Sequence, residues 1–140
     1  MSSLPLLLLF ATPALAQLPQ AGAYEVEARL QLPNILGWVA QKTTMVCLPP
    51  ADASALPLPV LSDNNPFGAC WATSVRRDGA ELSFDIACPG RGAARAHAAY
   101  RLAPAAFEGR IDMVMGGKNM TMTEFQSGRR TGDCPKGGTP

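Results

Sequence analysis

The sequence contains little histidine, the most common catalytic base, and its cysteines are not spaced as metal ligands. It holds one histidine, and its four cysteines lie far apart with no Cys-x-x-Cys motif. These absences argue against a zinc site and against a thioredoxin-like exchanger. An excess of one charge is also lacking, since the formal net charge is +1. A near-neutral chain argues against nucleic acid or acidic membranes as obligate partners.

Long hydrophobic runs are absent except at the N-terminus. Residues 4–10 are apolar apart from Pro5 and too short to span a bilayer, and the small-x-small sequence Ala14-Leu15-Ala16 follows. We therefore expect a signal peptide over residues 1–16, cleaved between Ala16 and Gln17, although its first residues carry no Lys or Arg. A buried N-terminal helix is the alternative. No cysteine follows the cleavage site, so we expect a soluble periplasmic or secreted protein rather than a lipoprotein.

Most of the remaining chain alternates between apolar and polar residues, which is typical of half-buried strands. In the first such segment Tyr24, Val26 and Leu30 alternate with charged residues. The pattern predicts strands over 23–32, 39–48, 70–77, 81–88, 93–102, 106–115 and 119–128. With short turns and no strong amphipathic helix, it predicts an all-β fold: an antiparallel, strongly curled meander sheet or a small barrel of about seven strands. We expect one domain over residues 17–134 and a disordered tail over 135–140.

One long connection interrupts this pattern. Residues 49–67 contain five prolines and an Asp-Asn-Asn cluster, so at most one helical turn fits there. We expect a loop that covers the sheet, and the alternative is a lid or a partner contact.

An even number of cysteines in an exported chain predicts two disulfides, for which three pairings are possible. Cys70 and Cys88 bracket an Asp78-Gly79 turn, and a fold-back centred on Gly79 sets them opposite one another. A two-residue turn would send their sulfurs to opposite faces, so this pairing predicts a three-residue loop or a bulge. Cys47 and Cys134 would then join an early strand to the C-terminal end.

Two Met-x-Met pairs flank a Gly-Gly-Lys-Asn turn. Folding at Gly117-Lys118 predicts Met115 opposite Met120 and Met113 opposite Met122, with all four thioethers on one face. Methionine is a flexible filler of cores, and Phe107 and Ile111 in the same phase favour that interpretation. The alternative is a Cu(I) site, because copper(I) prefers soft thioether ligands.

No candidate catalytic residues emerge. His97 lies on a polar strand face between Arg95 and Arg101, with no carboxylate or thiol near it in sequence, so we interpret it as a surface residue. The carboxylates of the strands are expected on the solvent face opposite Arg95, Arg101 or Arg110, and their spacing selects no acid–base pair. They are Asp85, Glu108, Asp112 and Glu124.

Five segments carry a resemblance to a known family: Thr44–Pro49, Cys70, Ser83–Cys88, Met113–Thr123 and Ser127–Cys134. Over most of the expected domain the chain resembles the bacterial domain of unknown function 3617, a family of small exported proteins with four cysteines. That family has no assigned activity, so the resemblance implies compartment, fold and disulfides rather than a reaction. The proline-rich stretch departs from the family's more charged segment.

Together these patterns predict an exported, non-catalytic β domain that serves as a ligand-binding or envelope accessory module, without a cofactor. Its expected partner is an apolar ligand or an envelope protein. The alternative is a periplasmic Cu(I)-binding protein that uses Met113, Met115, Met120 and Met122. A hydrolase is disfavoured because no nucleophile–base pair is apparent.

Overall fold

The strands follow the alternating segments closely. The computed structural model describes residues 19–50, 67, 70–90, 94–116 and 120–137, so the expected signal peptide and most of the proline-rich connection lie outside the described residues. The seven strands are β1 (Gly22–Gln31), β2 (Ala40–Leu48), β3 (Trp71–Asp78), β4 (Glu81–Ala87), β5 (Arg95–Ala103), β6 (Ala106–Met115) and β7 (Met120–Gly132).

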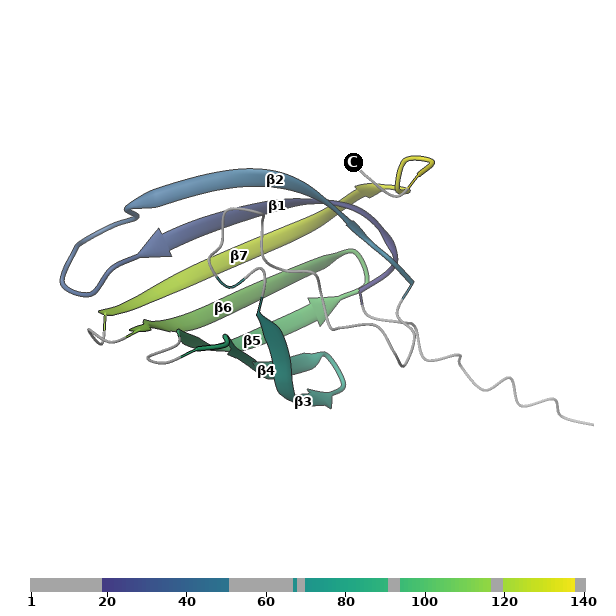
Figure 1. Cartoon of the computed structure of the whole chain (residues 1–140). Helices are drawn as coiled ribbons and strands as arrows, with labels where there is room; N and C mark the ends of the chain where they lie inside the picture. The colour runs from purple at the N-terminus through teal and green to yellow at the C-terminus, as the bar shows by residue number, and fades with distance from the viewer. Residues whose placement is uncertain (1–18, 51–66, 68–69, 91–93, 117–119, 138–140) are drawn as a thin grey trace, which may run out of the picture.

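All seven strands join one antiparallel sheet in the order β2-β1-β7-β6-β5-β4-β3 (Figure 1). The β1–β2 hairpin forms one side, and β3 to β7 form a meander that returns across the sheet. β7 therefore lies beside β1, where nine residues of β1 pair with it between Ala23 and Gln31. The N-terminal hairpin and the C-terminal strand are thus neighbours.

The sheet is open, with β2 and β3 as its two edges. The all-β, antiparallel, seven-stranded part of the sequence prediction is confirmed. Barrel closure is wrong, because β2 and β3 are not hydrogen-bonded to one another. The open sheet does not bear out the predicted strong curl either. Alternation within a strand reports which residues face the core, but it carries no information on whether the outer strands meet. In the described part of the chain, no helix is long and apolar enough to cross a membrane.

One face of the sheet carries the hydrophobic core. Tyr24, Tyr100 and Ile111 are fully buried there, and so is Phe67, from outside the strands. Each such side chain contributes about 1.5–3 kcal/mol through its removal from water. The other members of the cluster are Val26, Leu48, Leu82, Phe84, Ile86, Ala96, Ala98, Leu102, Phe107 and Met113.

Two glycines make room for aromatic rings on this face. Gly109 lies opposite Tyr100 and Gly128 lies opposite Phe107. A Cβ atom at either glycine would overlap the facing ring. The rings thus cover the two glycines, which offsets the weakness that glycine brings to a strand.

The two disulfides join the pairs that the sequence favoured, Cys70–Cys88 and Cys47–Cys134. In the first hairpin Asp78 pairs with Glu81, which leaves a two-residue turn. The register then shifts between Thr73 and Arg76. Such a bulge inserts one extra residue into β3, and that residue returns Cys70 to the same side as Cys88.

Candidate functional site

The methionine hairpin has the predicted register. Met113 pairs with Met122, and Met115 pairs with Met120, across β6 and β7. The turn itself, residues 117–119, lies outside the described residues. The exact register follows from the local turn, because a short hairpin fixes which residues face one another.

The four methionines differ in their surroundings. Met113 is only 3 % exposed and belongs to the core cluster, and Met115 and Met122 pack against that cluster while half-buried. Met120 is 59 % exposed. Met113, Met115 and Met122 therefore pack in or against the core, and Met120 faces solvent.

The remaining metal ligands form no cluster. All four cysteines are in disulfides, so no thiolate is available as a metal ligand. Within the described ranges, no group of three or more His, Cys, Asp or Glu side chains could hold a metal ion.

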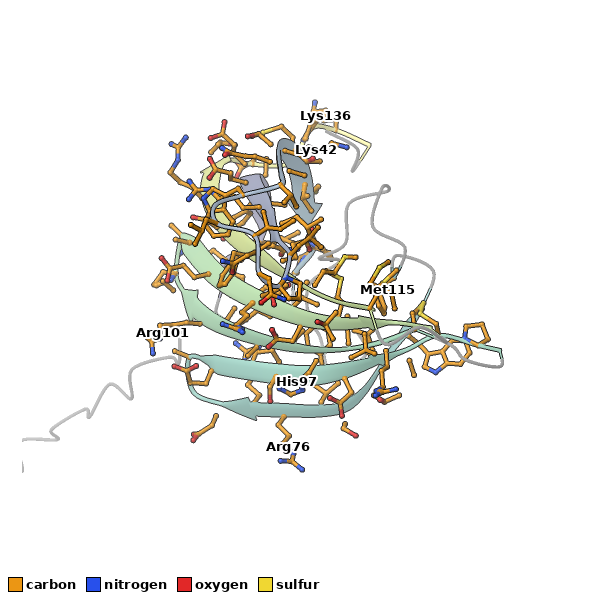
Figure 2. All side chains as sticks on the ribbon, turned by 90° about the vertical axis from the view of Figure 1, so that its left-hand side faces the viewer. Lys42, Arg76, His97, Arg101, Met115 and Lys136 are labelled. Atoms are coloured by element: carbon orange, nitrogen blue, oxygen red, sulfur yellow. A yellow bond between two sulfur atoms is a disulfide. The ribbon has the colours of Figure 1, made fainter. Side chains whose placement is uncertain are left out.

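In the strand register a polar row crosses the solvent face of β4, β5, β6 and β7, with His97, labelled in Figure 2, as its member on β5. His97 lies between Asp85 and Asp112 in the strand register, and its Nδ1 is 2.7 Å from Oδ1 of Asp85. Both side chains of this pair are more than half exposed. The sequence analysis missed the pairing, because it placed no carboxylate near His97 and expected an arginine opposite Asp85. A cross-strand register for the β4–β5 hairpin would have found it.

Asp112 takes its partners from its own strand and from β7. Arg110 Nε donates to both Asp112 oxygens, at 3.1 and 3.0 Å, and the Thr123 hydroxyl donates to Oδ1 at 2.9 Å. The hydrogen bonds from Arg110, helped by the one from Thr123, lower the pKa of Asp112 against the opposing effect of partial burial. The hydroxyl of Thr123 thus serves the carboxylate rather than His97, and no nucleophile–base pair results.

Glu124 is not on the solvent face, so its predicted placement is wrong. It pairs directly with the fully buried Ile111, which puts it on the core side of β7. There it accepts a 2.9 Å hydrogen bond from Gln126, whose Oε1 accepts one of 3.0 Å from the Tyr100 hydroxyl. Burial, reinforced by the charge of Glu124, raises the pKa of Tyr100 well above its usual value.

A second group of side chains forms a four-membered stack on the solvent face. Trp38, from the turn between β1 and β2, meets Phe125 of β7 edge-on, with ring centroids 5.4 Å apart. The guanidinium of Arg29 lies 5.5 Å from the centre of the Trp38 ring, and that of Arg110 lies 5.4 Å from the Phe125 ring. Each cation–π contact contributes about 0.5–1 kcal/mol at exposed sites.

This stack lines a hollow of about 740 Å³ on the solvent face. Most of the other side chains that line it are charged, and most of the charges are paired: Arg29 with Glu27, Arg101 with Glu81, and Arg129 with Glu25. Sequence reasoning missed the hollow. The odd-numbered polar residues of β1 and β7 were visible, but only the β1–β7 register brings Arg29 opposite Phe125.

The comparisons with known proteins bear on the whole domain. The model of a protein family, described as a protein of unknown function (DUF3617), matches residues 19–134. The chain belongs to the DUF3617 family. The matched DUF3617 region contains every strand of the sheet and all four cysteines. No curated protein and no solved structure matches the chain. The two disulfides of this DUF3617 protein indicate an oxidising, extracytoplasmic location.

Proposed function

We propose that this DUF3617 protein is an exported, non-catalytic domain that binds a neutral, hydroxyl-rich ligand in the hollow on the solvent face. The leader over residues 1–16 would direct export to the periplasm or beyond. The hollow around the Trp38–Phe125 pair carries the proposal, because it joins an exposed aromatic surface to many polar groups.

The charges of the hollow support a neutral ligand. Four arginines and four glutamates line it, so neither an anion nor a cation is strongly preferred. Charged side chains that form ion pairs with one another present hydrogen-bond donors and acceptors at fixed positions. Trp38 is 46 % exposed and offers an apolar edge beside them. A sugar has the matching combination of hydroxyl groups and apolar ring faces, whereas the apolar ligand expected from the sequence would meet mostly charged walls.

The surroundings of His97 support a binding role. Among the described residues, Asp85 is the partner that the structure gives His97, and the pair stands on an exposed strand face. A triad needs a hydroxyl or thiol within reach of the base and a site that excludes water. The exposed position of His97 does not exclude water.

Titration of isotopically labelled protein with oligosaccharides of the cell envelope, including soluble peptidoglycan fragments, tests this function. We expect the indole N–H signal of Trp38 to shift, and we expect Trp38→Ala and Glu108→Ala to weaken binding about tenfold or more. Trp71→Ala, outside the hollow, is the matched control. An unchanged Trp38 signal across the panel would count against the proposal.

The second candidate is Cu(I) binding by Met113, Met115, Met120 and Met122. The observation that favours it is the register, which faces Met113 with Met122 and Met115 with Met120. A native mass spectrum recorded after addition of Cu(I) tests it. The proposal expects one bound copper, lost in the variant Met115→Leu/Met120→Leu with little loss of stability. No copper uptake by the parent protein would eliminate this candidate.

A further inference from the structure

The exposed apolar side chains are concentrated at one end of the sheet. This end holds the turn between β1 and β2, the start of β7, the end of β6 and the start of β3, and several of these strand ends lie on the left in Figure 1. In the described part of the chain, six of the eight exposed large hydrophobic residues belong to it: Ile35, Leu36, Trp38, Val39, Trp71 and Met120. We call it the apolar end. Soluble surfaces seldom gather such side chains without a partner.

The tip of the turn between β1 and β2 presents Ile35 and Leu36 to solvent. Leu36 is fully exposed at its tip. The backbone is folded by positive φ angles at Asn34 and Gly37, and the amide of Val39 donates to the carbonyl of Leu30 at 2.9 Å. The tip is thus a turn with a defined backbone conformation. Its exposed leucine does not pack against the rest of the domain.

A second hollow lies directly beside this tip. It measures about 450 Å³ and is lined by residues 31–36 and 121–123, none of which is charged. The apolar end therefore combines projecting side chains with an uncharged recess.

The described residues of the apolar end carry no carboxylate. Among the described residues, no Asp or Glu occurs over 31–40, 70–73, 86–90, 94–96, 113–116 or 120–123, which form the strand ends and turns of this end. Arg95, at the start of β5, is exposed there. Carboxylates such as Asp78, Glu81 and Asp133 lie instead at the opposite strand ends.

We propose that the apolar end docks on an anionic phospholipid surface, with Ile35 and Leu36 inserted and the two tryptophans at the interface. Trp38 and Trp71 stand near opposite edges of the sheet at this same end, and tryptophan prefers the boundary between headgroups and hydrocarbon. The exposed Arg95, with no carboxylate among the described residues around it, suits anionic headgroups. The net charge of +1 does not reveal this preference, because it sums the charges at both ends of the sheet.

The test is co-sedimentation of the full chain with vesicles of phosphatidylethanolamine and phosphatidylglycerol. We expect Leu36→Asp to weaken association about tenfold or more, since burial of one leucine accounts for that much. Val75→Asp is the matched control, because Val75 is an exposed apolar residue outside this end. Circular dichroism verifies that both variants fold, and the full exposure of Leu36 means that its replacement removes no packing.

The two tryptophans report directly on the docked face. Trp38→Phe and Trp71→Phe each leave one of the two tryptophans of the chain, and brominated phospholipids should quench both single-tryptophan proteins. Attachment through a retained leader would leave Leu36→Asp bound and the tryptophans unquenched, which overturns the proposal. Equal binding to phosphatidylcholine vesicles overturns the preference for anionic lipid. A dimer dissolved by Leu36→Asp, without vesicle binding, would assign this end to self-association instead.

Discussion

At the residue scale, the contacts between glycines and aromatic rings are the least tolerant feature of the core. Gly109→Ala would place a methyl group into the ring of Tyr100, whose hydroxyl is fixed by Gln126. We expect a loss of about 1–3 kcal/mol in the free energy of unfolding, measured by urea denaturation. In a Tyr100→Leu background the same change should cost much less, and an equal cost in both backgrounds would show that the ring is not the cause.

The two tyrosines give the protein a distinctive alkaline titration. Burial raises the pKa of Tyr24, partly opposed by Arg130, and raises the pKa of Tyr100 well above its usual value. The ordinary value near 10 applies to the unfolded chain. Absorbance at about 295 nm should therefore show no full tyrosinate step near pH 10 in the native protein, and a two-tyrosine step there in urea.

The same shifts predict a loss of stability in alkali. Above about pH 10 the unfolded chain binds fewer protons than the folded one, so the free energy of unfolding falls as pH rises toward the folded-state pKa values. Tyr100→Phe should remove the larger part of this decline. A native titration at the ordinary tyrosine value would contradict both expectations.

At the element scale, the bulge in β3 is held by a residue in an unfavourable backbone region. Ser74 has φ of 52°, the left-handed conformation that the first residue of one bulge type adopts and that glycine prefers. Ser74→Val should lower the free energy of unfolding by about 1–2 kcal/mol in urea denaturation, because branched residues resist this region.

Ser74→Gly is the matched control for the bulge and should leave stability unchanged or raise it by up to about 1 kcal/mol. Thiol titration under mild reduction provides a second measurement. Ser74→Val should expose the Cys70 and Cys88 thiols at lower reductant concentration than the parent protein does, since the bulge aligns the two cysteines. Identical behaviour of the valine and glycine variants would contradict this role.

Local hairpins explain what the sequence could predict. The Met115–Met120 pairing, and the need for either a three-residue loop or a bulge beside Cys70, both follow from counting residues outward from a short turn. The β1–β7 pairing has no such turn, because its strands come from opposite ends of the chain. Two features depend on that pairing and could not be predicted: the stack of Trp38 on Phe125, and the extension of β7 to Gly132, which pairs with Ala23.

At the scale of the whole molecule, the Cys47–Cys134 disulfide links the edge strand β2 to the chain just beyond β7, across the position of β1. It closes 87 residues of sequence, against 18 for Cys70–Cys88. In the chain-entropy model the longer closure contributes about 4–5 kcal/mol and the shorter about 3 kcal/mol.

Replacing Cys47 and Cys134 together by serine should therefore lower the free energy of unfolding more than the corresponding change at Cys70 and Cys88. Urea denaturation of the two double variants makes the comparison, with each remaining disulfide verified by mass. A larger loss at Cys70 and Cys88 would mean that the local hairpin, rather than the long closure, dominates the stability.

The placement of β1 between β2 and β7 also sets the order in which the molecule can be completed. The β1–β2 hairpin is synthesised first, yet one edge of β1 stays unsatisfied until the last strand arrives. A two-stranded hairpin is at best marginally stable in water. Folding must therefore wait for the C-terminus, and a chain truncated before β7 would expose an unpaired strand edge that invites aggregation.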